Sequence, residues 1–290
     1  MKITNELGLP QPFVDAVSRE YQYKDKQYSV TSLLKGTMQS ILERRYADVI
    51  EQDVSDMVWM IFGTAVHSIL EHSKESENQL KENWLCIDIG EYKLSGIFDL
   101  YDAKLKRVSD YKTGSVWKVQ FNDWEDYRKQ LLIYAYMLRS IGFECDNGEI
   151  VMLLKDHSKT KANIDASYPQ HNVHIQHFDF SQKDFNDVEE FIYKKFAEIK
   201  LNENRADEEL TPCTEEERWE EPTKYAVKKK GNKRAIRVYE SLEEAQTHIE
   251  SEKGLELEVR KGTCKRCQDY CSVKDYCWFY RKKYGKDETV

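Results

Sequence analysis

Apolar residues recur at helical spacing in four stretches of the first two thirds of the chain. Repeats of three or four residues predict helices over 28–46, 58–72, 124–141 and 181–201. The stretch 28–46 opens with Ser29 and Thr31, which are candidate N-caps. In 58–72, Gly63 and Ala65 would allow another backbone to approach closely. We therefore expect helices on both sides of the segment 84–112.

Between 84 and 112 the period shortens toward two, which is typical of strands. The runs WLCIDIG, YKLSGIFDLY and RVSDYK are separated by turn residues and predict a strand meander. Two further apolar runs, 149–155 and 173–180, predict additional strands. Strands interleaved with helices in this order predict an α/β fold with a mixed central sheet flanked by helices.

The C-terminal third has a different pattern. KYAVKKKGNKRAIRVY predicts a hairpin that turns at Gly231 and Asn232, and a capped helix and the strand LELEVR follow it. We therefore expect a small hairpin, helix and strand unit followed by a cysteine-rich, metal-binding tail. The expected regions are an N-terminal helical region 1–54, a core 55–201, an acidic linker 202–222, a basic unit 223–262 and the tail 263–290.

The net charge of −8 over 290 residues argues against a uniformly basic nucleic-acid binder. Charge is unevenly distributed, however, because acids cluster over 203–221 and cations follow them. A cationic hairpin tip can track phosphates without reading sequence, and the alternative is an ordinary solvated turn. The candidate DNA-binding residues are Lys228, Lys229, Lys230, Lys233 and Arg234.

No stretch approaches the roughly 18 apolar residues of a membrane span, and the first residues lack the apolar core of a signal peptide. We therefore expect a cytoplasmic protein with no membrane partner. The seven cysteines then favour reduced thiols or metal ligands over a disulfide framework.

The segment IFDLYDAKLKRVSDYKTG, residues 97–114, concentrates the candidate chemistry. Asp110 and Lys112 are alternate residues of one predicted strand, and Asp99 is on its neighbour. Two converging carboxylates repel each other unless a cation or proton lies between them, and Mg²⁺ or Mn²⁺ would satisfy them with oxygen ligands. Lys112 could then orient a water and oppose charge that develops on phosphorus. The alternative is a surface hairpin with weak, solvated ion pairs.

These motifs resemble the PD-(D/E)XK nuclease superfamily, in particular its RecB-like branch, which includes CRISPR-associated exonucleases and phage recombination nucleases. The sequence from Gly96 to Asp99 resembles the glycine-to-aspartate motif, and Asp110-Tyr111-Lys112 resembles the acid-x-lysine motif. The matches occur in family order over 63–134. Two residues of the following helix, Gln130 and Tyr134, and the earlier His67 match further family positions.

The resemblance implies a restriction-endonuclease-like fold and a metal-dependent DNA nuclease. The implied metal ligands are His67, Asp99, Asp110 and the carbonyl of Tyr111, which would hold one or two Mg²⁺ or Mn²⁺ ions. The implied catalytic residues are Asp99, Asp110, Lys112, Gln130 and Tyr134, with Glu71 as an additional supporting residue.

Within this family the expected activity is that of an exonuclease, which hydrolyses linear or single-stranded DNA during phage or mobile-element replication or recombination. A replication or recombination protein is then an expected partner. The alternative function is a catalytically silent nucleic-acid-binding or assembly module that retains the nuclease fold.

Four cysteines crowd into the tail, separated by two, three and five residues: Cys264, Cys267, Cys271 and Cys277. Thiolates at this spacing suit zinc or an iron-sulfur cluster, and the spacing does not decide between them. Free structural cysteines are the alternative. Cys86 and Cys145 lie in core-like patterns and are expected to be buried.

The resemblance implies a 4Fe-4S cluster held by three C-terminal cysteines and a distant fourth. Relatives often carry that fourth cysteine near SVTSLLKG, where this chain has Lys35. The fourth ligand must therefore come from elsewhere. We favour Cys213, together with Cys267, Cys271 and Cys277, and Cys264 is the alternative ligand.

Overall fold

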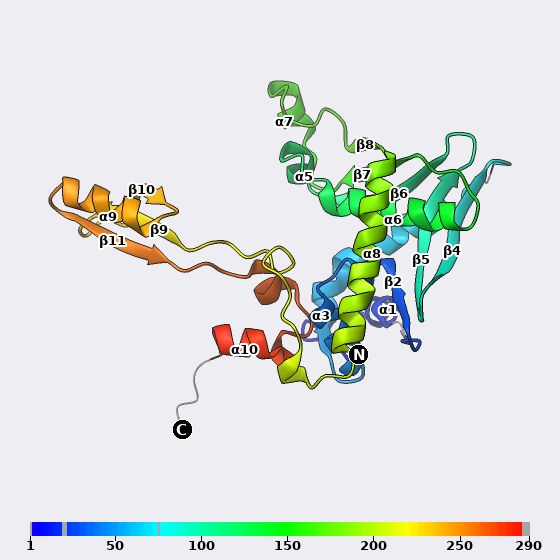
Figure 1. The fold of residues 1–290 in the computed structure, drawn as a ribbon. Coiled ribbons are helices and arrows are strands. Elements are labelled where there is room, and N and C mark those ends of the chain that lie inside the picture. Colours follow the sequence, from blue (N-terminus) through cyan, green and yellow to red (C-terminus); the bar gives the residue numbers. More distant parts are fainter. Residues whose placement is uncertain (1, 19–21, 75, 286–290) are drawn as a thin grey trace. The chain divides into compact units, whose positions relative to one another are not determined.

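The computed structural model describes residues 2–18, 22–74 and 76–285 (Figure 1). The chain forms two compact units, which meet in the sequence at Arg205 and Ala206. In the described part of the chain, no helix has the length and apolar character that crossing a membrane requires.

The first unit is built on a mixed six-stranded sheet. Its strand order is β2-β5-β6-β7-β8, and β4 pairs with β5. β2–β5 and β6–β7 are parallel pairs, whereas β4–β5, β5–β6 and β7–β8 are antiparallel. The predicted mixed sheet is thereby confirmed. The strands are β2 (Gln27–Ser29), β4 (Gln79–Ile89), β5 (Tyr92–Asp102), β6 (Arg107–Gly114), β7 (Asn147–Leu154) and β8 (Val173–Asp179).

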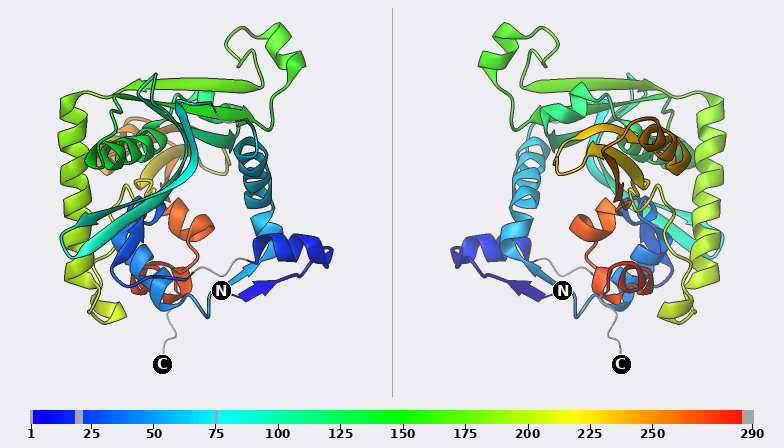
Figure 2. Two further views of the ribbon diagram at one scale, coloured as in Figure 1. Left: turned by 90° about the vertical axis from the view of Figure 1, so that its right-hand side faces the viewer. Right: turned by 90° about the vertical axis from the view of Figure 1, so that its left-hand side faces the viewer.

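Helices flank this sheet, as the sequence predicts. α6 and the long helix α8 lie side by side in both views of Figure 2 and pack against each other. α8 begins with a capping box in which Ser181 and Asp184 each bind the other's backbone N–H. The helices are α1 (Gln11–Val17), α2 (Val30–Leu33), α3 (Thr37–Arg45), α4 (Val58–Glu71), α5 (Val116–Gln120), α6 (Glu125–Ser140), α7 (Lys159–Ile164) and α8 (Gln182–Asn202).

The single helix predicted over 28–46 is wrong. The segment instead contains the end of strand β2 and two short helices, α2 and α3. The Ser29 side chain caps α2, and the extended Gly36 is the N-cap of α3, so the helical path stops between them. Apolar spacing continues across this break because both helices bury apolar residues. Before α4, β1 (Lys2–Thr4) and β3 (Glu51–Asp53) form a two-stranded parallel sheet.

One edge of β5 has two different partners, and this division positions the candidate site. β4 pairs with β5 along its length, so β2 and β6 share the opposite edge. β2 pairs with residues 93–95, and β6 pairs with residues 100–102. The intervening segment from Gly96 to Asp99 lies where β2 and β6 diverge. A Cβ on Gly96 would lie 2.7 Å from Cε1 of Tyr134, so glycine leaves the space that this ring occupies.

The second unit contains a small antiparallel sheet, as predicted. β9 (Lys224–Lys229) is central, with β10 (Ala235–Tyr239) and β11 (Leu255–Arg260) on either side. α9 (Leu242–Ser251) covers it and buries Ala245 against Val227 and Leu255. Gly231 adopts a φ of 86° at the hairpin turn. A π-helical turn at Arg266–Tyr270 and α10 (Trp278–Tyr284) follow.

Candidate active site in the mixed sheet

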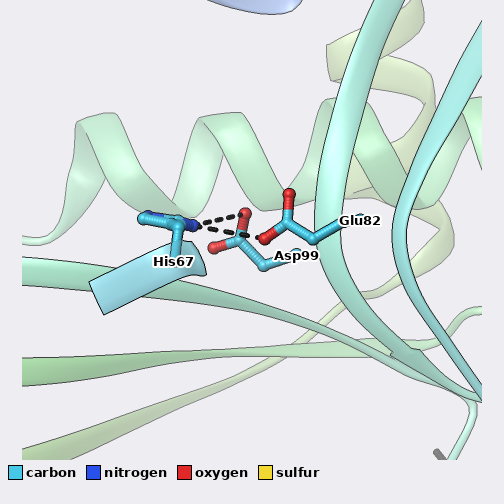
Figure 3. A group of neighbouring side chains, drawn as sticks. All are labelled: His67, Glu82 and Asp99. Carbon is cyan, nitrogen blue, oxygen red and sulfur yellow. Dashed lines mark hydrogen bonds and ion pairs between the residues drawn. The ribbon is translucent and has the colours of Figure 1, made fainter. Parts of the chain in front are cut away.

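Three side chains from three elements converge beside the gap in the edge of β5, which is the segment from Gly96 to Asp99 that pairs with neither β2 nor β6 (Figure 3). His67 comes from α4, Glu82 from β4 and Asp99 from β5. The His67 Nδ1 atom lies 3.4 Å from Glu82 Oε1 and 3.4 Å from Asp99 Oδ1. One potential ligand atom from each residue lies within 4.8 Å of the other two. An imidazole and two carboxylates at this spacing form a possible divalent-metal site.

Sequence reasoning missed Glu82, and the backbone explains why. The predicted strand begins at Trp84, but β4 begins at Gln79 and therefore includes Glu82. The β4–β5 register joins Lys81 to Leu100 and Asn83 to Phe98 and passes over Glu82 and Asp99. Glu82 has a φ of 48°, which is uncommon for a residue other than glycine. Such conformations cluster at functional sites, but they cannot be predicted from residue type and periodicity.

Asp99 is held by the neighbouring strand. The β5–β6 register joins Leu100 to Ser109 and ends there, so Asp99 and Asp110 would form the next pair. Instead the strands separate, and the backbone N–H of Tyr111 donates a hydrogen bond of 2.6 Å to Asp99 Oδ2. The Asp99 Oδ1 atom remains directed toward His67.

The interaction with Asp99 also changes the protonation of His67. This contact raises the pKa of His67 to about 9, and Glu82 acts in the same direction against the opposing effect of burial. Burial raises the pKa of Glu82, as does the charge of Asp99. Without a metal ion, the His67 imidazole is therefore protonated at neutral pH.

Asp110 and Lys112 form an ion pair next to this group. The Lys112 Nζ atom lies 2.5 Å from Asp110 Oδ2, and Gln130 Nε2 donates to Asp110 Oδ1 at 3.3 Å. Asp110 is only 4 % exposed, and burial raises its pKa to about 6 although Lys112 attracts its charged form. Burial lowers the pKa of Lys112, but attraction to Asp110 outweighs this effect and the net shift is upward.

The remaining predicted residues of this site are placed as follows. Tyr134 is buried on α6, and burial together with the charges of Asp110 and Asp99 raises its pKa. The Tyr111 ring lies 6.2 Å from that of His67. Glu71 is exposed, and its backbone carbonyl accepts a hydrogen bond from Lys81. Of the described residues, the tight metal-like group contains neither Glu71 nor Asp110.

In the second unit, the five candidate cysteine ligands do not form a tight cluster within the part of the chain that the structure describes. Burial raises the pKa of the Cys267 thiol to about 12, and the nearby thiols of Cys264, Cys271, Cys213 and Cys277 act in the same direction. Among the described residues, no three of these sulfur atoms lie within 4.8 Å of one another. The buried Cys264 Sγ accepts a hydrogen bond of 3.3 Å from Lys283 Nζ. Elsewhere, Cys145 is buried as predicted, whereas Cys86 is only partly buried.

The predicted DNA-binding residues of the hairpin differ in their partners. Lys228 Nζ lies 3.1 Å from Glu258 and 3.5 Å from Glu256 on β11, so its charge is partly neutralised across the sheet. The other four are exposed at or near the turn: Lys229, Lys230, Lys233 and Arg234.

The fold and site together define an α/β protein with an acid-x-lysine motif beside an aspartate on diverging strands of a mixed sheet. The sequence model of the PD-(D/E)XK nuclease superfamily matches residues 13–278. The chain therefore belongs to the PD-(D/E)XK nuclease superfamily. No curated protein matches it.

Three solved structures are similar to the chain at low identity. SSO0001 is 17% identical, with a TM-score of 0.44, and the match covers 71% of this chain and 90% of that one. A phage-related exonuclease from Haemophilus somnus 129PT is 12% identical, with a TM-score of 0.29 and coverage of 60% and 82%. LHK-Exo, solved in complex with dAMP, is 11% identical, with a TM-score of 0.31 and coverage of 59% and 91%.

Proposed function

We propose that this protein is a metal-dependent DNA nuclease. The convergence of His67, Glu82 and Asp99 beside the buried Asp110–Lys112 pair is the observation that carries this proposal. Hydrolysis of a phosphodiester requires stabilisation of negative charge around phosphorus, and a divalent cation with an adjacent ammonium supplies it. Superfamily membership independently favours this activity.

The side chains fit a hard divalent cation such as Mg²⁺ or Mn²⁺. Carboxylate and carbonyl oxygens are the ligands that these ions prefer. Asp110 Oδ2 is buried and, among the described residues, has no partner with hydrogen-bond geometry, although Lys112 is close to it. A buried carboxylate oxygen requires a compensating cation, which Lys112 supplies and a metal ion could share. The proposed ligands are His67, Glu82, Asp99, Asp110 and the Tyr111 carbonyl.

The bound ion would polarise the phosphoryl oxygen and lower the pKa of a water. The chain's own residues then have separate tasks. Lys112 holds a positive charge beside the reacting phosphate and orients the attacking water. Gln130 fixes Asp110 through its amide, and Tyr134, one helical turn further along α6, supports the same side of the site.

We further assign the chain to the RecB-like branch of the superfamily, because His67 contributes an imidazole to the acidic site. The corresponding activity is that of an exonuclease acting on linear or single-stranded DNA. Its role would be in phage or mobile-element replication or recombination, together with a protein partner. The test uses end-labelled linear single-stranded, linear duplex and circular DNA with Mn²⁺, Mg²⁺ or chelator. Cleavage of linear DNA only, dependent on metal, is expected. Absence of cleavage under every condition would instead favour a silent binding module.

We also propose a second metal centre, a 4Fe-4S cluster held by Cys213, Cys267, Cys271 and Cys277, on the basis of the close sequence spacing of the tail cysteines and the family resemblance. Four thiolates on one tetrahedral zinc ion, with Zn–S bonds of about 2.3 Å, lie about 3.8 Å apart. A four-iron cluster instead binds each thiolate to a separate iron. Cys213 is the proposed fourth ligand by resemblance to the family, and Cys264 is the alternative.

Protein purified without oxygen should be brown, with stoichiometric iron and sulfide. Cys213→Ser should remove the colour, and Cys264→Ser should retain it. Colourless protein that contains one zinc ion would exclude the cluster.

A further inference from the structure

A cavity of about 400 Å³ opens at the gap in the edge of β5. Its volume lies within the range of small-molecule sites. One wall is Tyr134, whose ring occupies the space beside Gly96. Its lining includes Lys24, Ser29, Thr31, Trp84, Ile97 and Tyr134, together with the amides of Gln22 and Gln27.

The cavity has a flat apolar wall that is open to solvent. Trp84 and Ile97 are directly paired across β4 and β5, and they are 58 % and 51 % exposed. The Lys24 Nζ atom lies 5.9 Å from the centroid of the Trp84 ring. An exposed indole beside an aliphatic side chain and an ammonium group suits an aromatic ring that carries a negative charge nearby.

This wall lies next to the proposed metal ligands. Trp84 and Glu82 are alternate residues of β4, and Ile97 and Asp99 are alternate residues of β5. The Cα atoms of residues two positions apart along an extended strand are separated by about 7 Å. Tyr134 connects the same two places, because it lines the cavity and is close enough to Asp110 and Asp99 for their charges to affect it.

We propose that this cavity binds an unpaired nucleoside adjacent to the phosphodiester that is cleaved. The inference rests on the proposed nuclease function and specifies its substrate. The base stacks on Trp84 and contacts Ile97, and Lys24 binds a neighbouring phosphate. In a duplex, both faces of an internal base are already stacked, so the cavity selects single strands or frayed ends.

The polar part of the cavity favours binding without base specificity. The Ser29 hydroxyl accepts from the Ser32 N–H and lies 3.0 Å from the Thr31 hydroxyl, so Thr31 is the hydroxyl that can turn toward a ligand. A hydroxyl group can donate or accept, so it can satisfy different base edges or a sugar hydroxyl. Stacking is also tolerant of sequence, because every base has a π face. The cavity should therefore accept all four bases with similar affinity.

Binding is measured by fluorescence anisotropy with a labelled single-stranded oligonucleotide, with Ca²⁺ in place of Mn²⁺ so that binding is measured without relying on turnover. Trp84→Ala should weaken binding by about 5- to 100-fold, which is the range for loss of one base–aromatic stack. Trp117→Ala is the matched control, because Trp117 is also 58 % exposed but does not line the cavity. It should weaken binding less than twofold.

A series of oligonucleotides that each lack one base identifies the stacked nucleoside. At one position, removal of the base should weaken binding to the wild-type protein but not further weaken binding to Trp84→Ala. Trp84→Phe, which keeps an aromatic ring, should recover most of the affinity and controls for folding. Equal losses for the alanine variants at 84 and 117, or additive losses at every abasic position, would overturn the inference.

Metal-dependent cleavage by the wild-type protein is measured separately. Cleavage without the Trp84 effect would reject the nucleoside site and leave the nuclease function intact. The Trp84 effect without cleavage by the wild-type protein would reject the nuclease function and show a strand-binding protein instead.

Discussion

The acidic site of the first unit and the basic hairpin of the second are both rich in charged residues, but their charges have different surroundings. Asp99 and Asp110 are buried close to each other, where like charges raise each other's free energy. On the hairpin, Lys228 is paired with glutamates of the adjacent strand, and the cations near the turn are exposed to water. Water screens the second arrangement, and the protein must balance the first with specific partners.

This difference in surroundings indicates which charged residues can be substituted without a large loss of function. A buried carboxylate pair is unfavourable for folding, so its presence indicates a use for which another residue will not serve. Exposed lysines interact with phosphate as separate point charges, and one can be lost without removing the others. We therefore expect single substitutions to have large effects in the acidic site and small effects in the hairpin.

The largest effect is expected for the aspartates of the site. Asp99→Ala and Asp110→Ala should each reduce metal-dependent cleavage by more than about 100-fold, because even partners of metal ligands contribute 10- to 100-fold. Asp88→Ala is the control, since this aspartate is also on β4–β5 but its side chain is 74% exposed. Initial rates with end-labelled DNA measure the effect. An Asp110→Ala variant that folds and retains full activity would contradict the assignment.

The next prediction separates the charge of Glu82 from its backbone conformation. Glu82→Gln keeps the side-chain shape, and Glu82→Gly suits the φ of 48°. Both should weaken Mn²⁺ binding by about 10-fold or more in calorimetric titrations. Without metal, only the glycine variant should be more stable, by about 1 kcal/mol, because it relieves the backbone strain.

Retention of Mn²⁺ affinity by Glu82→Gln would show that Glu82 acts through the backbone alone. Glu71→Gln is the matched control, because Glu71 is an exposed acid outside the His67 group. It should leave Mn²⁺ affinity unchanged.

The contrast also explains how far the sequence could predict the site. Asp99, Asp110 and Lys112 stand at recognisable spacings on strands, and the alternating pattern that reveals the strands also places these residues near one another. Glu82 depends on a left-handed backbone conformation, and the division of the β5 edge between β2 and β6 depends on contacts between distant segments. Gly36 likewise interrupted a helical pattern that apolar spacing alone would continue.

Protonation of His67 should have a smaller, pH-dependent effect on Mn²⁺ affinity. With a pKa of about 9 for His67, a proton competes with the metal at neutral pH, so Mn²⁺ affinity should rise about tenfold per pH unit between pH 7 and 8.5. Below about pH 6, protonation of Asp110 should make the dependence steeper.

His67→Gln should bind Mn²⁺ more weakly but with little pH dependence between pH 7 and 8.5. Calorimetry in two buffers with different ionisation enthalpies measures the protons released, and about one per ion is expected for the wild-type protein at pH 7.5. A wild-type affinity that does not change over this range would contradict the role of His67.

The smallest effects are expected in the hairpin. Lys230→Gln should weaken single-stranded DNA binding similarly for all sequences and reduce the slope of log affinity against log salt by about 0.7, the value for one phosphate contact. Lys228→Gln should change the slope less, because Glu256 and Glu258 already engage this lysine. Anisotropy titrations at several salt concentrations measure both slopes. If the two substitutions reduce the slope equally, the cross-strand ion pairs do not withhold Lys228 from DNA, and the hairpin then acts through its total charge.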